Sequence, residues 1–169
     1  SEDTLIKLAV QDFVFNAISI SNKKKQARLI SSISDFIVAK KDVQSVLNAL
    51  SDEQIEIVSL TITEKGYHYN SVKKELDFSN QNVTYDLGNL GKPKTAVGFL
   101  VAGLRDRYLS GKAPFTVLSC DNLPNNGAIV KKIIEEHGGV LKLEDSESSE
   151  PEDIIGALIS IELPKSINT

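Results

Sequence analysis

Residues 55–62 read IEIVSLTI, a mostly apolar run that is rich in β-branched side chains. Such a run predicts a strand buried on both faces, as in a parallel sheet. Residues 114–119, which read PFTVLS, predict a second strand of the same kind. Between the two strands, an apolar stretch over residues 96–104 predicts a helix that begins after Thr95 and is ended by Gly111. Two buried strands, each followed by a turn and then a helix, indicate parallel pairing through right-handed crossovers, and hence a doubly wound, mainly parallel α/β sheet.

The flanking segments continue this alternation of helices and strands. Residues 3–15 place apolar side chains at helical spacing, and residues 14–20 can form a strand after them. Helices are also predicted over residues 43–50 and over residues 128–137, where the apolar side chains lie on one side. The fold class is therefore α/β over most of the chain.

Three expectations concern which residues are buried. Residues 68–94 are polar and contain Asn, Asp, Gly and Pro, which predicts a long excursion outside the core. Cys120 is expected to be buried at a strand end and unreactive, because no histidine is close to it in the sequence. Arg105 and Arg107 are expected to form ion pairs on the solvated face of their helix.

The character of the chain changes after Leu143. Residues 144–153 contain six acidic residues, three serines and one proline, which predicts a disordered or loosely held linker. The apolar residues 154–163 fit either a helix or an edge strand. We therefore divide the chain into a partial nucleotide-binding domain over residues 1–143 and an acidic linker with a C-terminal segment over residues 144–169.

Composition narrows the class of function. The chain has 169 residues, of which 41% are hydrophobic and 25% charged, values typical of a soluble globular domain. A net charge of -4 argues against a nucleic-acid partner, and no apolar run approaches the roughly 18 residues of a membrane span. A single cysteine, Cys120, fits a reducing, cytoplasmic setting. Two distant histidines, His68 and His137, predict no zinc site.

Two polar motifs follow the two predicted strands. Residues 61–67 read TITEKGY, and residues 119–127 read SCDNLPNNG. The carboxyl ends of the strands in an open α/β sheet form a crevice into which helix N-termini point, and ligands bind there. The residues alone therefore indicate two clusters that face one cleft, with a chemistry that they do not specify.

Both motifs resemble those of a known family. Residues 57–67 (IVSLTITEKGY) and 114–127 (PFTVLSCDNLPNNG) are similar to two blocks of the mannitol dehydrogenase family of long-chain polyol dehydrogenases. Weaker matches extend the resemblance over roughly residues 5–135. The second block looks more like the branch of mannitol 2-dehydrogenase, fructuronate reductase and arabinitol dehydrogenase than the sugar-phosphate branch. No cluster of basic residues near the motifs suggests a phosphorylated substrate.

The resemblance implies a partial Rossmann-like fold and an NAD- or NADP-dependent, zinc-independent oxidoreductase. Its substrate would be a sugar, a polyol or a keto-acid. Asn122 would donate a side-chain N–H to the substrate carbonyl as an alkoxide develops. Thr63, Glu64 and Lys65 would lie beside the nicotinamide and its ribose, and Asp121 would hold the turn or the cofactor pocket.

The same residues also have purely structural interpretations. Asn122 can form a turn and cap the next helix. Glu64 can form a structural ion pair, and Lys65 can meet a phosphate or a carboxylate instead of acting as a general acid or base.

The chain also departs from the family pattern. It contains no G-x-G-x-x-G turn for the pyrophosphate, and residues 142–169 do not resemble the family's helical domain, which carries a catalytic lysine with its companion Asn and His. We therefore expect the parent protein to be an enzyme and this chain to be inactive alone. The alternative is a truncated, non-catalytic α/β module that serves binding or interaction.

Overall fold

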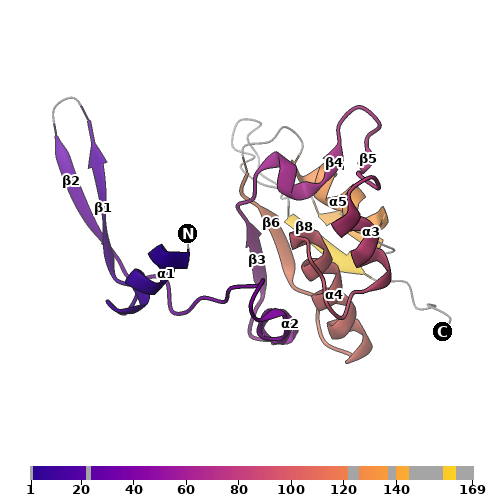
Figure 1. The fold of residues 1–169 in the computed structure, drawn as a ribbon, viewed down its shortest axis with the longest axis horizontal. Helices are drawn as coiled ribbons and strands as arrows, with labels where there is room; N and C mark the ends of the chain where they lie inside the picture. The colour runs from indigo at the N-terminus through magenta and orange to yellow at the C-terminus, as the bar shows by residue number, and fades with distance from the viewer. Residues whose placement is uncertain (1, 22–23, 122–125, 137–139, 145–157, 163–169) are drawn as a thin grey trace. The chain divides into compact units, whose positions relative to one another are not determined.

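The chain forms two compact units, residues 1–42 and residues 43–169 (Figure 1). The computed structural model describes residues 2–21, 24–121, 126–136, 140–144 and 158–162. The two units are described separately below.

The first unit contains one helix and one hairpin. Helix α1 (Glu2–Ala9) is followed by two residues with left-handed backbone, Asp12 with φ 52° and Phe13 with φ 59°. Strand β1 (Phe15–Ile20) then pairs antiparallel with β2 (Lys25–Ile30). The helix predicted over residues 3–15 is confirmed only as far as Ala9, the strand after it is confirmed, and β2 is an addition.

The second unit is built on a four-stranded sheet in the order β3-β6-β8-β7. Strand β3 (Ile57–Leu60) runs parallel to β6 (Thr116–Ser119), as predicted from the two apolar runs. Strand β8 (Leu158–Glu162) is antiparallel both to β6 and to β7 (Val140–Glu144). The apolar segment 154–163 thus contributes a strand rather than a helix, but this strand lies between two others instead of at an edge.

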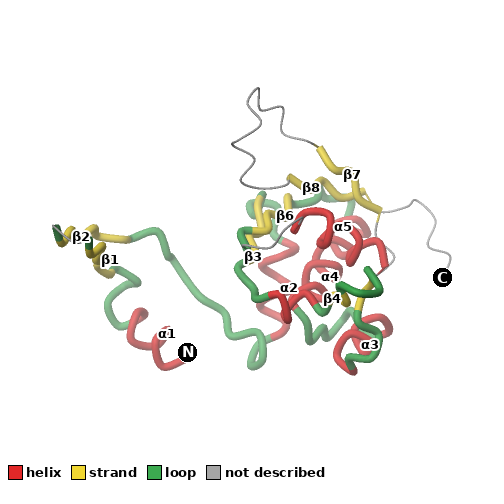
Figure 2. Tube along the Cα trace, turned by 90° about the horizontal axis from the view of Figure 1, so that it is seen from above, coloured by secondary structure: helices red, strands yellow, loops and turns green. Residues whose placement is uncertain are grey.

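Helices pack on one side of this sheet. Helix α4 (Ala96–Leu109) connects β3 to β6, and α5 (Asn126–Glu136) follows β6; both lie on the same side of the β3–β6 pair (Figures 1 and 2). Helix α2 (Val43–Ser51) packs closely on α4, since a Cβ atom at Gly103 would lie 2.6 Å from Cβ of Leu50. The buried apolar core comes mainly from α4, β6 and α5, and includes Val97, Leu100, Leu104, Phe115, Val117, Val130, Ile133 and Ile134.

Burial of β3 on both faces is a prediction that the structure contradicts. Leu60 is buried, but Ile57 is 60% exposed and Ser59 is also exposed. The reason is position, because β3 is an edge strand of the described sheet and the described helices of this unit cover only one of its faces. An apolar run indicates only a tendency to be buried, and whether the strand is buried depends on the strands and helices packed against it.

The segment 68–94 is part of the core, contrary to prediction. It forms β4 (Tyr69–Asn70), β5 (Glu75–Leu76) and helix α3 (Gln81–Gly88). Leu76, Val83 and Asp86 within it are fully buried. The buried Asp86 carboxylate accepts hydrogen bonds from the backbone N–H of Lys94 (2.8 Å) and from the backbone N–H (2.9 Å) and hydroxyl (2.7 Å) of Thr95. These bonds compensate its desolvation and fix the start of α4.

Arg107 also differs from prediction, since its side chain is buried and not on a solvated face. It is 2% exposed, and its guanidinium donates to backbone carbonyl oxygens rather than to carboxylates. Nε donates to Leu50 O (2.7 Å), Nη1 to Ala113 O (3.0 Å), and Nη2 to Ile55 O (2.7 Å) and to Asp52 O. One side chain thereby ties the end of α2, the start of β3 and the loop before β6 together. Arg105 is exposed, as predicted.

Candidate functional site

The two motifs meet at the carboxyl edge of the β3–β6 pair. Leu60, the last residue of β3, lies opposite Ser119, the last residue of β6. The next residue, Cys120, donates its backbone N–H to Leu60 O at 2.9 Å. Because the strands are parallel and end together, residues 61–67 and 119–121 leave the sheet side by side. The predicted convergence of the two strand-end motifs is therefore present.

A tyrosine from the first motif joins it to the second. The hydroxyl of Tyr67 lies 2.7 Å from Oγ of Ser119 and donates a hydrogen bond to Oδ2 of Asp121. The same carboxylate oxygen accepts the backbone N–H of Ile62 at 3.1 Å. Asp121 is thus held from two positions of the first motif, which fixes the start of the turn that follows β6.

Burial and hydrogen bonding keep this tyrosine protonated. Burial raises the pKa of Tyr67 to about 12, and the hydrogen bond to the Asp121 carboxylate adds to the increase, whereas the bond with Ser119 opposes it. A phenolate here would stand beside a carboxylate with little solvent to stabilise either charge. Tyr67 therefore keeps its proton at neutral pH and can donate it in the hydrogen bond to Asp121.

The turn that carries Tyr67 presents polar side chains to solvent. Helix η1 (Glu64–Tyr67) is a 3-10 turn, in which Gly66 donates its N–H to Thr63 O at 2.7 Å. Tyr67 is buried at the end of this turn, while Thr63, Glu64 and Lys65 are exposed. The buried tyrosine anchors the turn, and the three polar residues stand free at the sheet edge, where a ligand can reach them.

The predicted site residues are thus partly placed. Thr63, Glu64, Lys65 and Asp121 come together at one edge of the sheet. Asn122 follows Asp121 directly but lies outside the described residues. Sequence analysis missed the roles of Tyr67 and Ser119, although both lie in the quoted motifs. Both residues lie at the ends of predicted parallel strands, which was the available signal. The contact between Tyr67 and Ser119 follows only once the register of β3 against β6 is known.

Cys120 is exposed, so the prediction of a buried thiol is wrong. Successive side chains of a strand point to opposite faces. Ser119 faces the core and is buried, and Cys120 at the next position consequently faces outward.

Across the described ranges, no three His, Cys, Asp or Glu side chains lie together as a metal site would require. In those same ranges no helix is long and apolar enough to cross a membrane.

Comparison with known proteins connects this edge to a family. A family model described as the mannitol dehydrogenase Rossmann domain matches residues 5–154. The chain belongs to the mannitol dehydrogenase family. The α/β fold class predicted from the two strands is confirmed with it, as a Rossmann domain with a mixed sheet.

Curated relatives and solved structures agree with this assignment. The mannitol 2-dehydrogenase of Aspergillus clavatus is 41% identical over 130 residues, which are 76% of this chain and 26% of that protein, and the mannitol 2-dehydrogenase of Pyricularia oryzae is 40% identical over the same length. Pseudomonas fluorescens mannitol 2-dehydrogenase, solved with NAD and D-mannitol, is 34% identical with a TM-score of 0.75, covering 85% of this chain and 33% of that chain. A substrate-free D-sorbitol dehydrogenase is 29% identical with a TM-score of 0.77, covering 88% of this chain and 35% of that one. This chain therefore spans about a quarter of the length of the curated relatives that it matches.

Proposed function

We propose that this chain is part of an NAD- or NADP-dependent oxidoreductase that transfers hydride between the nicotinamide and a ketose/polyol pair or a keto-sugar acid. The observation that carries the proposal is the linkage of Tyr67, Ser119 and Asp121, which joins both motifs at the carboxyl edge of the parallel pair. In open α/β sheets this edge is where dinucleotides bind. Membership of the mannitol dehydrogenase family supports the same chemistry.

The described residues fit one end of a nicotinamide dinucleotide. Thr63, Glu64 and Lys65 are exposed at the edge and offer a hydroxyl, a carboxylate and an ammonium group, which suit a ribose and an amide. The pyrophosphate end has no counterpart, because the sequence contains no G-x-G-x-x-G turn. The cofactor supplies the hydride acceptor or donor when bound, and these three residues would hold its nicotinamide ribose.

Asn122 is proposed to polarise the substrate carbonyl. A side-chain amide can donate an N–H to the oxygen that becomes an alkoxide, without itself changing protonation. Its neighbour Asp121 would be a positioning residue, since its carboxylate is already engaged by Ile62 N–H and by the Tyr67 hydroxyl. A fixed Asp121 would limit the positions open to the next side chain along the chain.

Proton transfer to or from the substrate is assigned to another part of the protein. The pKa of Tyr67 is about 12, so its hydroxyl holds its proton at neutral pH. The family resemblance places the proton-transfer lysine in a helical domain that residues 142–169 do not resemble. We accordingly propose residues 1–143 as the nucleotide-binding part of a cytoplasmic enzyme, with catalysis completed by that further domain.

The proposal is tested with the full-length protein and with this chain alone. Full-length protein should oxidise NADH or NADPH with fructose or a keto-sugar acid, followed by absorbance at the nicotinamide band. The 169-residue chain should show no turnover and only weak NADH binding by fluorescence. A full-length protein that binds no nicotinamide cofactor would instead support a non-catalytic α/β module.

A further inference from the structure

A pocket lined by three lysines lies between the β4–β5 hairpin and helix α5. Its volume is about 620 Å³, within the range of small-molecule sites. Its charged lining residues are three lysines, Lys73 and Lys74 from the hairpin and Lys132 from α5. The rest of the lining is uncharged and comprises Tyr69, Ser71, Ala128 and Ile129.

The two walls of the pocket are held together by a bond that does not involve these lysines. Glu136 of α5 accepts the backbone N–H of Leu76, in β5, at 2.6 Å through Oε2. Leu76 is fully buried, so the hairpin is fastened to the helix at its base. The lysines stand on a fixed frame, and their convergence is a property of the fold.

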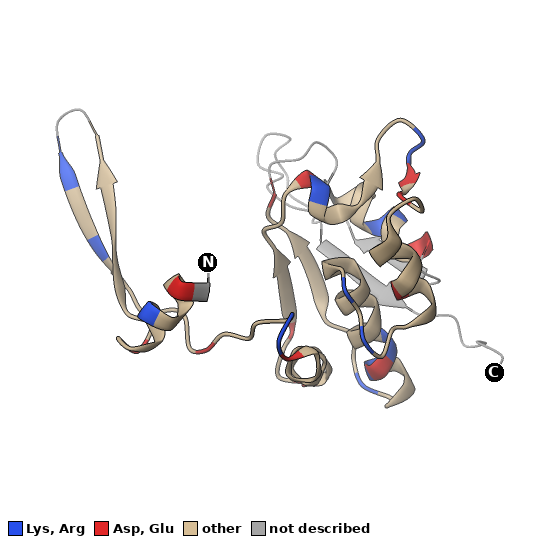
Figure 3. Cartoon of the chain, viewed as in Figure 1, with Lys and Arg blue, Asp and Glu red and all other residues tan. Residues whose placement is uncertain are grey.

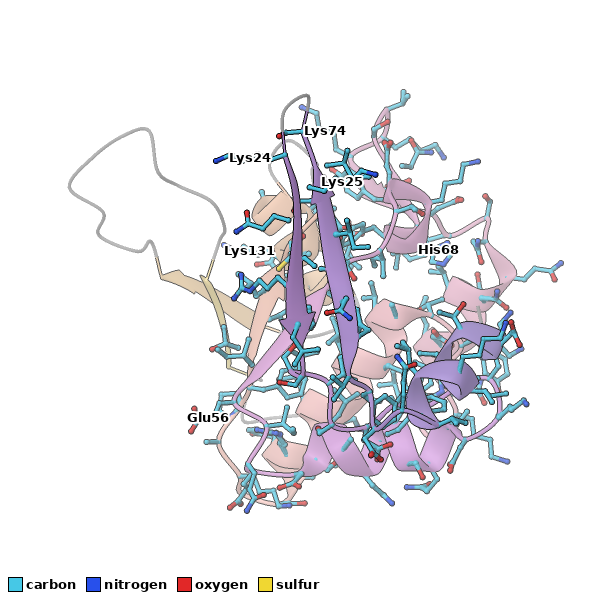
Figure 4. The ribbon with its side chains drawn as sticks, turned by 90° about the vertical axis from the view of Figure 1, so that its left-hand side faces the viewer. Lys24, Lys25, Glu56, His68, Lys74 and Lys131 are labelled. Atoms are coloured by element: carbon cyan, nitrogen blue, oxygen red, sulfur yellow. The ribbon has the colours of Figure 1, made fainter. Side chains whose placement is uncertain are left out.

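The lysines are only weakly neutralised by their neighbours. Lys73 lies 3.8 Å from the Glu75 carboxylate in an exposed pair, and such pairs contribute little. Lys132 lies 3.4 Å from the Glu136 carboxylate, which also serves the bond to the hairpin. Lys74, which is labelled in Figure 4, has no ion pair to another described residue.

The backbone at Lys74 is left-handed. Lys74 has φ 55°, in the left-handed region that favours Gly or Asn in a turn. A lysine at this position has a conformational cost that a glycine would avoid. Figure 3 shows blue on the β4–β5 hairpin and on α5 below it, with red beside the blue on the hairpin.

We propose that this pocket binds an oxyanion group of a small molecule, a phosphate or a carboxylate. Three ammonium groups around one hollow favour a compact negative charge, and Ser71 can add a hydroxyl donor. Tyr69 and Ala128, which line the pocket, follow the two strand-end motifs in the sequence. This inference rests on the lysines and not on the proposed hydride chemistry.

The test is a titration of the 169-residue chain with inorganic phosphate, followed by ¹H–¹⁵N NMR at constant ionic strength. Backbone signals of the β4–β5 hairpin and of the start of α5 should shift in a saturable manner. Lys74→Gln should raise the dissociation constant about fivefold, the scale of one exposed charge contact, and Lys132→Gln should do the same. Lys92→Gln, at an exposed lysine outside the pocket, is the matched control and should leave the dissociation constant for phosphate unchanged.

A parallel titration with acetate identifies the kind of oxyanion. Tighter binding of phosphate assigns the pocket to a phosphate group, and equal affinity assigns it to carboxylates as well. Absence of saturable shifts with both anions would overturn the proposal. Equal dissociation constants for Lys74→Gln, Lys132→Gln and Lys92→Gln would overturn it too. Lys74 forms no ion pair with a described side chain, so Lys74→Gln remains informative if Lys132→Gln disturbs α5.

Discussion

Replacement of Tyr67 by phenylalanine isolates the hydrogen bonds that join the two motifs. The ring is retained, so the buried apolar contacts stay and no cavity forms, while the hydroxyl between Ser119 and Asp121 is lost. A hydrogen bond to a charged group contributes about 1.5–3 kcal/mol, and the bond with the neutral Ser119 adds about 1 kcal/mol. Tyr67→Phe should therefore lower the free energy of unfolding by about 2.5–4 kcal/mol.

Urea unfolding of the 169-residue chain, followed by circular dichroism, measures this loss. Tyr69→Phe is the control, because Tyr69 is half-buried and its hydroxyl makes no hydrogen bond to another described residue. It should change the free energy of unfolding by less than about 0.5 kcal/mol, as at ordinary surface positions. A Tyr67→Phe protein as stable as the Tyr69→Phe protein would refute the argument that this hydroxyl locks Asp121 in place.

Three further perturbations test the frame around the site. The pKa of Tyr67 is raised from 10.0 to about 12 in the folded chain, so the stability that this group contributes is complete below pH 10 and is lost as the pH rises towards 12. The urea midpoint should therefore fall more steeply across this pH window for wild type than for Tyr67→Phe. Parallel curves for the two proteins would contradict a pKa difference of Tyr67 between the folded and unfolded states. Gly98→Ala should destabilise by about 1–3 kcal/mol, because its Cβ would lie 2.2 Å from Oδ2 of Asp86, while Gly88→Ala meets no atom within 4 Å and should be tolerated in the same thermal scan. Arg107→Lys leaves fewer donors for the four backbone carbonyls that the guanidinium now serves, and it should lower the free energy of unfolding by about 2–4 kcal/mol. Arg105→Lys, at an exposed position, should leave the stability unchanged. Equal melting temperatures for the two variants would show that the buried guanidinium is not needed.

The sequence predicts the parallel pair, its connecting helix and the strand-end position of both motifs. These features follow from the local sequence pattern, because a run of apolar, β-branched residues such as residues 55–62 predicts a strand that tends to be buried. The pairing of β3 with β6 then brings the motifs together without further information.

Other features depend on contacts between distant residues, which a local pattern does not encode. Arg107 is charged and looks like a surface residue, yet the backbone carbonyls of two loops and of α2 satisfy it in the core. Asp86 is buried for the same reason, since Lys94 and Thr95 supply its donors. The grouping of Lys74 with Lys132 likewise exists only once the hairpin has packed on α5.

The central claim is that the edge formed by the two motifs is the reacting edge of a polyol dehydrogenase, and Asn122→Ala in the full-length protein tests it most directly. Loss of one donor to a developing oxyanion lowers turnover by about 10²–10³. Steady-state kinetics with NADH and a ketose should show this drop in kcat, with the KM for the cofactor unchanged. Asn125→Ala, three residues further along the sequence, is the control and should stay close to wild type. Turnover in Asn122→Ala equal to wild type would contradict the claim and leave Asn122 with the structural role of a turn residue.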